Sequence, residues 1–156
     1  MRYLFGIFWF KLGLVLLMLI NGDWQLSSVV DFIDAGSFLL FVFAITTMVI
    51  ITNQSALFLS AVKAMFFRKH RLIPELAARA VRLFKLLRKT VWYTAVLGTI
   101  VAVVLMMRNL QDMDVLAANT ALSFLFPFYG VFINIIFVNP AINIFESQAL
   151  SDGDDE

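Results

Sequence analysis

Residues able to carry out catalysis or hold a metal ion are almost absent from this chain. It contains no cysteine and a single histidine, His70, which stands among three basic residues. Metal sites usually need three or four convergent ligands, and the sequence has no glycine-rich phosphate loop, no His-Glu metal motif and no plausible acid/base pair. We therefore expect no enzyme activity, no metal and no cofactor, and we interpret His70 as a solvated loop residue.

The small and hydroxyl-bearing residues that remain as candidates form two stripes within long apolar segments. In residues 91–107, Gly98, Thr99 and Ala102 follow Ala95 at helical spacing; the second stripe, in residues 115–138, consists of Thr120, Ser123, Pro127, Gly130 and Asn134. Small residues let helices approach closely in a membrane. The stripes are interpreted either as one surface for a partner helix or as the packing surface between two helices of one subunit.

One charged side chain, Lys11, falls near the middle of the first apolar segment. Because a charge at that depth is costly, Lys11 is predicted either to pair with a carboxylate of a partner helix or to extend to lipid headgroups. None of the acidic residues lies within an apolar segment. A carboxylate that carries ions across the bilayer would therefore have to come from another chain.

The elements that position these residues follow from hydropathy. The chain is 62% hydrophobic and 15% charged, whereas about a quarter of the residues of a soluble domain are charged. Runs close to the length of a membrane span, about 20 residues, occupy residues 3–20, 38–59, 91–107 and 115–138. We predict an all-α integral membrane protein, a single domain with four transmembrane helices. The first helix is expected to be an uncleaved anchor, because no small-residue cleavage site follows it.

The distribution of charge predicts the orientation of these helices. Nine of the twelve Lys and Arg residues lie in the connection at residues 60–90, whereas the other two connections carry mainly Asp. By the positive-inside rule the basic connection is cytosolic and both termini are inside. The acidic tail, residues 151–156, is expected to be disordered in the cytosol.

Part of the basic connection has a helical pattern that begins at Pro74. Arg79, Arg82, Lys85 and Arg88 lie opposite an apolar face made of Leu76, Ala77, Ala80, Leu83, Phe84 and Leu87. One interpretation is contact with anionic lipid headgroups or an acidic partner. The other is that this helix continues the third spanning helix into the cytosol.

Several short strings occur in a characteristic order. Gly98-Thr99 lies in the third apolar segment and Tyr129-Gly130 in the fourth; the other strings are Asn109-Leu110-Gln111-Asp112, Pro140-Ala141, Phe32-Ile33-Asp34 with Ser37 and Leu39-Leu40, and Ala61-Val62-Lys63 with Phe66. In these strings the chain resembles the MotA/TolQ/ExbB family of ion-channel subunits, and most closely its MotA and PomA members. No gap is needed between Gly98 and Pro140.

The resemblance implies a proton-channel or motor subunit of the bacterial inner membrane. Five copies would surround a dimeric single-helix partner of the MotB, TolR or ExbD kind, which supplies the ion-carrying aspartate. Thr99 would face the ion path, with Thr120 and Ser123 beside it. The chain departs from the family at Phe126-Pro127, where the family has a threonine pair, and this loss of hydroxyls favours protons over sodium.

Further departures from the family are Trp92, in place of a proline, Ala102, in place of a glycine, and the short connection at residues 60–90. Flagellar members of the family carry a large torque-transmitting domain at this connection. The alternative function is therefore a non-conducting membrane scaffold of the same fold, which recruits lipid or cytosolic partners through its basic loop. Neither function involves nucleic acid.

Overall fold

The computed structural model describes residues 12–13, 15–16, 34–66, 72–108 and 110–150. Lys11, most of the predicted first span, His70 and the acidic tail lie outside the described residues. Within the described ranges every regular element is helical, which confirms the all-α prediction there. The named elements are α3 (Ala35–Ile51), α4 (Ser55–Phe66), α5 (Pro74–Arg108), α6 (Met113–Ile133), the π-helical segment η1 (Asn134–Val138) and α7 (Asn139–Leu150).

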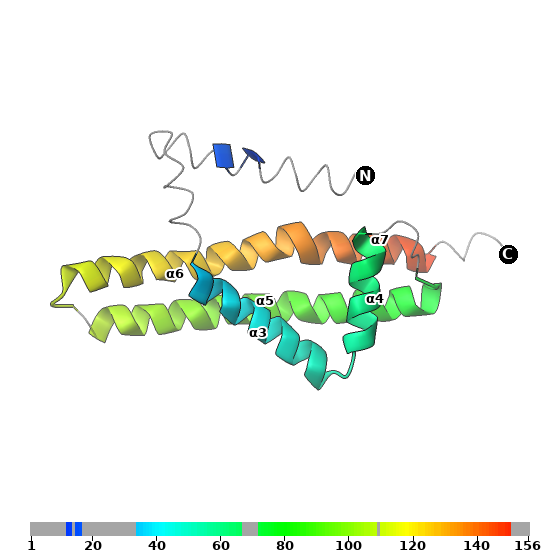
Figure 1. Cartoon of the computed structure of the whole chain (residues 1–156), viewed down its shortest axis with the longest axis horizontal. Helices are drawn as coiled ribbons and strands as arrows, with labels where there is room; N and C mark the ends of the chain where they lie inside the picture. The colour runs from blue at the N-terminus through cyan, green and yellow to red at the C-terminus, as the bar shows by residue number, and fades with distance from the viewer. Residues whose placement is uncertain (1–11, 14, 17–33, 67–71, 109, 151–156) are drawn as a thin grey trace.

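Two long helical rods lie side by side and antiparallel along the molecule (Figure 1). The first is α5, with 35 residues, about 52 Å long at 1.5 Å per residue. The second is the continuous run of α6, η1 and α7, with 38 residues. The first rod begins at Pro74, as predicted, because proline fits the first turn of a helix. Asp112 begins the second rod by accepting hydrogen bonds from the amides of Asp114 and Val115.

The second rod continues well beyond residue 138, where the fourth span was predicted to end. Pro140 has no N–H, and in a regular α-helix its ring would crowd the carbonyl four residues earlier. Just before it the helix widens into η1, in which the amide of Asn139 donates to the carbonyl of Asn134, five residues back. The wider turn accommodates Pro140 and lets the helix run on to Leu150.

The segment predicted as the second span, residues 38–59, contains two helices rather than one. Asn53 has a φ of 52°, in the left-handed region that Asn tolerates better than most residues. The amides of Asn53 and Gln54 donate to the carbonyls of Ile50 and Val49, at 2.9 and 3.2 Å, in the Schellman arrangement that ends helices. The chain then turns, so α4 stands across the α5 rod (Figure 1).

The two halves of α5 pack against different neighbours. Around residues 74–89, which we call the basic half, α4 and α7 enclose a large buried cluster centred on Phe84. The ring of Phe84 contacts three other phenylalanines, namely Phe58, Phe137 and Phe145. Around residues 90–107, which we call the apolar half, the buried cluster is small and consists of Phe41, Val91, Ala95 and Tyr129.

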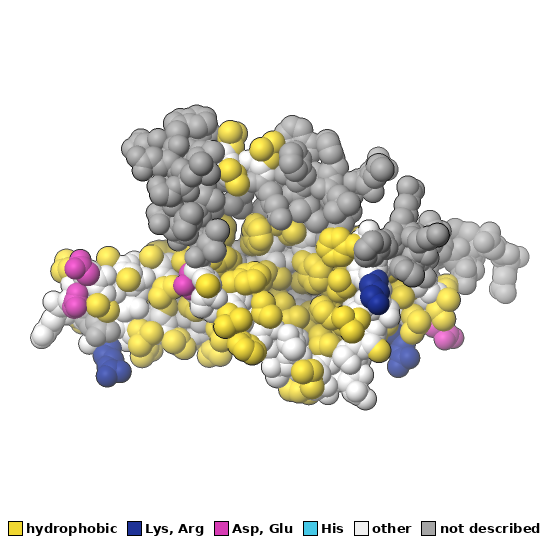
Figure 2. Space-filling model, in the orientation of Figure 1, with side chains coloured by type: hydrophobic (Ala, Val, Ile, Leu, Met, Phe, Trp, Pro, Cys, Tyr) yellow, Lys and Arg dark blue, Asp and Glu magenta, His cyan; other side chains and the backbone are white. Residues whose placement is uncertain are grey.

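Large apolar side chains lie inside in the basic half and outside in the apolar half. In the basic half, Phe84 and Leu87 are buried and the Arg and Lys side chains are exposed. In the apolar half, small residues such as Ala95 and Ala102 are buried. The exposed residues there are Trp92, Tyr93, Val96, Leu97, Ile100, Val101, Val104, Leu105 and Met107. Hydrophobic side chains also cover much of the middle of the molecule in Figure 2.

The dimensions of the apolar half fit a lipid bilayer. No charged residue lies between Lys89 and Arg108, a length of about 27 Å at 1.5 Å per residue, against about 30 Å for the hydrocarbon core. Trp92 and Tyr93 are exposed next to Lys89, where aromatic side chains commonly sit at the membrane surface. Both rods are long and apolar enough to cross a membrane. These features indicate a membrane protein.

Candidate functional site

The two predicted stripes meet each other along the seam between α5 and α6. A Cβ atom added to Gly98 would lie 2.3 Å from Cδ1 of Phe126, and one added to Gly130 would lie 2.8 Å from Cβ of Ala95. Gly98, Gly130 and Ala102 are all buried. Glycine is thus required because the helices approach so closely. In the single chain these three residues pack within one subunit, the second of the two interpretations of the stripes.

Thr99 connects the two helices through a carbonyl affected by Pro127. Because Pro127 has no N–H, the carbonyl of Ser123, four residues earlier, loses its usual helical donor. The Thr99 hydroxyl lies 3.4 Å from that carbonyl and 2.9 Å from the carbonyl of Ala95 on its own helix. Its single proton serves either acceptor. Thr99 of the first stripe and Ser123 and Pro127 of the second therefore form one local arrangement.

The other two hydroxyls of the seam also donate within the chain. Thr120 donates to the carbonyl of Leu116 at 2.7 Å and approaches the sulfur of Met106 on α5 at 3.1 Å. Ser123 donates to the carbonyl of Thr120 at 2.6 Å. Thr99, Thr120 and Ser123 are all partly buried. Their oxygens keep lone pairs that can accept a hydrogen bond or ligate a cation.

A buried polar atom lies further along the same helix. Asn134, only 4% exposed, donates from its amide nitrogen to the carbonyl of Gly130 at 2.9 Å. Its Oδ1 atom is buried and has no hydrogen-bond partner among the described residues. An unpaired acceptor in this position is costly. Together with Thr120 and Ser123 it gives the second rod, over α6 and the start of η1, a set of polar oxygens.

Asp34 makes a contact that the sequence interpretation did not foresee. Its carboxylate caps α3 by accepting from the amide of Ser37 at 2.7 Å, and its own amide donates to the hydroxyl of Tyr129 at 2.8 Å. Because the neighbouring Gly130 packs against Ala95, α3 begins level with the apolar half of α5 rather than near Arg108. The Asp-x-x-Ser capping pattern was readable, but the contact with Tyr129 required the fold.

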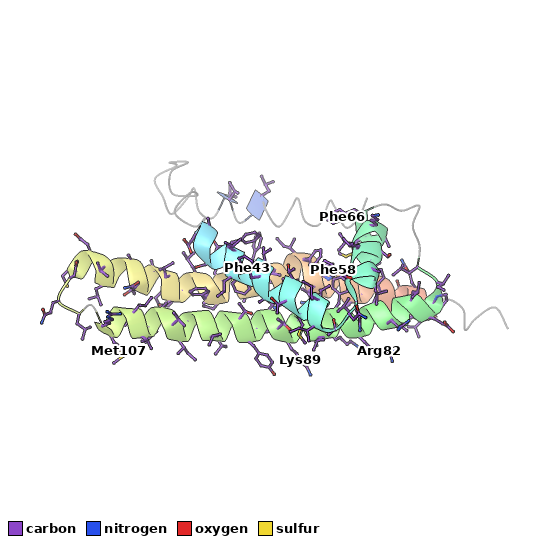
Figure 3. All side chains as sticks on the ribbon, turned by 60° about the horizontal axis from the view of Figure 1, so that its bottom comes forward. Phe43, Phe58, Phe66, Arg82, Lys89 and Met107 are labelled. Atoms are coloured by element: carbon purple, nitrogen blue, oxygen red, sulfur yellow. The ribbon has the colours of Figure 1, made fainter. Side chains whose placement is uncertain are left out.

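The basic helix predicted in the cytosolic connection is the first half of α5. Its apolar face is buried against α4 and α7, which favours the interpretation that this helix continues the spanning helix. Arg79, Arg82 and Lys85 are exposed, and Figure 3 shows Arg82 and Lys89 on the side of α5 away from α7. The ion pair in the described part of the chain joins Lys85 to Glu146 on α7, at 2.8 Å.

The structure and the comparisons add no enzyme-like or family feature. Among the described residues, no group of three His, Asp or Glu side chains could hold a metal ion. Comparisons with protein-family models, curated proteins and solved structures find no match to this chain. The functional argument therefore depends on the residues of the seam and on the surfaces of the two rods.

Proposed function

We propose that this chain is a membrane subunit of a proton-driven channel or motor of the MotA/TolQ/ExbB kind, which assembles as a ring around a single-helix partner. The observation that carries the proposal is the reversed pattern of α5. Over about the thickness of a bilayer, large apolar side chains face outward, whereas the seam with α6 holds Thr99, Thr120 and Ser123.

The partner is needed to supply the ion carrier. Residues 90–107 of α5 and 115–133 of α6 contain no charged side chain. Hydroxyl oxygens can assist an ion, but a proton carrier in a membrane is usually a carboxylate or a histidine. We assign this role to an aspartate of a single-helix partner. The carboxylate of Asp34, at the start of α3, accepts from the amide of Ser37 and caps that helix.

The proposed assembly has four spans per subunit in the bacterial inner membrane. The apolar half of α5 and the facing part of α6 are two of them, and the segments predicted at residues 3–20 and 38–59 are the others. Within the last of these, α3 covers only the part from the level of Ala95 towards the cytosolic side. The basic half of α5, with α4 and α7, then lies in the cytosol, and both termini are inside. The ring has five copies of this chain around two copies of the partner.

Copurification tests the assembly. The full chain, isolated from its native membrane in mild detergent, is expected to bring with it a protein that has one apolar span containing an aspartate. Electron microscopy of the particles is expected to show five copies around two. A strict monomer in the presence of the coexpressed single-helix protein contradicts the proposal.

Proton flux tests the path. In proteoliposomes containing the assembled complex, Thr99→Val is expected to reduce flux while leaving assembly intact, and Thr99→Ser is expected to retain flux. Thr46→Val, at an exposed position of α3, is the matched control and is expected to change neither. Equal flux in Thr99→Val and Thr46→Val contradicts the assigned path.

A specific observation favours a second candidate, a non-conducting membrane scaffold. The ring of Phe126 fills the space over Gly98, and all three seam hydroxyls already donate to atoms of this chain. On this alternative, the exposed Arg79, Arg82 and Lys85 recruit lipid or acidic cytosolic partners. Absence of partner-dependent flux in a correctly assembled complex would select the scaffold.

A further inference from the structure

We propose that a pocket between the α3–α4 junction and α5 binds a phosphate group carried by a hydroxyl-bearing molecule. The pocket has a volume of about 330 Å³ and is lined by Asn53, Gln54, Ala56, Leu57, Ser60, Leu76 and Arg79. It lies in the basic half of the molecule, outside the seam assigned to the ion path. It depends neither on ion conduction nor on a ring of subunits.

The helix break at Asn53 creates the pocket. With Asn53 in the left-handed conformation, α3 stops and α4 leaves at a steep angle (Figure 1), and residues of its first turns line the pocket together with Leu76 and Arg79 of α5. Thr52 strengthens this end by donating its hydroxyl to the carbonyl of Met48 at 2.8 Å. One continuous helix over residues 38–59 would leave no such pocket. The walls therefore belong to a defined turn of the chain.

The pocket carries a positive charge that no acidic side chain neutralises. Arg79 forms no ion pair in the described part of the chain, although Glu75 lies one turn away on the same helix. Its guanidinium group offers a planar set of N–H donors suited to phosphate oxygens. Ala56 and Leu57, in the first turn of α4, line the opposite wall. Their amides have no acceptor within the helix, and they add to the positive field of Arg79.

The remaining polar atoms call for a ligand that also has hydrogen-bond donors. The lining also contains the side chains of Asn53, Gln54 and Ser60, which carry oxygen acceptors. The Ser60 hydroxyl donates to the carbonyl of Ala56 at 2.8 Å, so its oxygen is available to a ligand only as an acceptor. A phosphate ion satisfies Arg79, but its P–OH donors lie on the same group that Arg79 would hold. A glycerol phosphate group supplies both the negative charge and the hydroxyl donors.

This chemistry has two sources, a lipid headgroup and a soluble phosphate ester. Along α5, Arg79 lies ten residues before Lys89, about 15 Å from the end of the uncharged segment. Along α3, the exposed apolar residues Ile50 and Ile51 lie directly beside Asn53. The distance of Arg79 from the uncharged segment favours a soluble ligand. The exposed apolar residues next to Asn53 favour a lipid such as phosphatidylglycerol. The shared feature is glycerol phosphate, and the experiment separates the sources.

The test uses the full chain in phosphatidylcholine nanodiscs, with sn-glycerol 3-phosphate as the soluble probe and phosphatidylglycerol as the lipid probe. Calorimetry measures binding of the first, and native mass spectrometry measures retention of the second. Arg79→Gln is expected to lower the affinity for whichever probe binds by about tenfold, because a charged hydrogen-bonding group is lost. Arg82→Gln, three residues away and outside the pocket lining, is the matched control and is expected to have little effect.

A second variant protects the result against an unfolding artefact. Ala56→Glu places a negative charge in the pocket and is expected to abolish binding, whereas Ala78→Glu, at an exposed position of α5 outside the lining, is not. Binding of either probe with this pattern supports the site and identifies its source. If neither probe binds, the proposal is overturned. Equal weakening by Arg79→Gln and Arg82→Gln overturns it as well, because it indicates general charge attraction.

Discussion

In the basic half of α5, Phe84 is fully buried and Arg82 and Lys85 face outward, whereas in the apolar half Gly98 is buried and Leu97 and Val104 face outward. In water, burial of large apolar side chains drives packing. In lipid that driving force between helices is absent, and close approach through small residues takes its place. The two halves of one helix thus match two different surroundings, water and lipid, and the boundary between them lies near Thr90.

Removing Phe84 is expected to have the largest effect on stability. The side chain is 0% exposed and contacts three other aromatic rings. Phe84→Ala is expected to lower the free energy of unfolding in detergent by about 3–5 kcal/mol. The control is Phe124→Ala, since Phe124 is 71% exposed on α6. Similar losses in both variants would break the comparison between a buried core and a lipid-facing surface.

The second-largest effect is expected from a new charge, which should impair membrane insertion in the apolar half but not in the basic half. Leu97 is 60% exposed in the apolar half, and arginine near the centre of a span costs about 2.5–3.5 kcal/mol in membrane insertion. Leu97→Arg is therefore expected to lower the inserted fraction in a membrane-insertion assay. Ala78→Arg, at an exposed position of the basic half, is expected to insert normally. Normal insertion of Leu97→Arg would place the apolar half outside lipid.

A methyl group at Gly98 is expected to have an intermediate effect. Because its Cβ would lie 2.3 Å from the ring of Phe126, Gly98→Ala is expected to cost about 1–3 kcal/mol through overpacking. Adding Phe126→Leu should recover part of that loss, as measured by unfolding of the double variant. Gly36→Ala meets nothing closer than 3.7 Å and should be neutral or stabilising. If the double variant recovers nothing, the seam is not packed as described.

The ion pair of the basic half is expected to have the smallest effect. Lys85 and Glu146 are 2.8 Å apart, but their side chains are 49% and 44% exposed. Such pairs contribute about 0.2–1 kcal/mol, and salt screens them. Lys85→Ala is therefore expected to lower the unfolding midpoint slightly at low salt and not at high salt. Arg82→Ala, which breaks no ion pair of the described chain, is the comparison; a large, salt-independent loss at Lys85 would contradict this.

Local patterns predicted the basic half of α5 well. Pro74 marked the helix start, and the 3.6-residue spacing of Ala77, Ala80, Phe84 and Leu87 identified the face that is buried. These features depend on backbone geometry and on neighbours within the same helix. The stripes of Gly98 and Gly130 were likewise recognisable, because small residues at helical spacing permit close approach.

Local sequence patterns did not predict the features that depend on contacts between distant segments. Asn53 ends α3, but a hydropathy window averages this one conformational signal over many apolar neighbours. The ring that occupies the space over Gly98 belongs to Phe126, for which the sequence indicated a lipid-facing or gap-filling position but not the residue it would meet. The fourth span was predicted to end at residue 138, but η1 accommodates Pro140 and the helix continues. Each outcome depends on which segments meet in space.

Cysteine labelling from each side of the membrane tests the central claim most directly, since the chain contains no cysteine of its own. Single variants Arg82→Cys, Val96→Cys, Ile100→Cys and Gln111→Cys would be exposed to a membrane-impermeant maleimide. We predict labelling of Arg82→Cys from the cytosolic side only, of Gln111→Cys from the opposite side only, and protection of the two variants between them. Rapid labelling of Val96→Cys and Ile100→Cys, or labelling of Arg82→Cys and Gln111→Cys from the same side, would contradict a membrane-spanning apolar half.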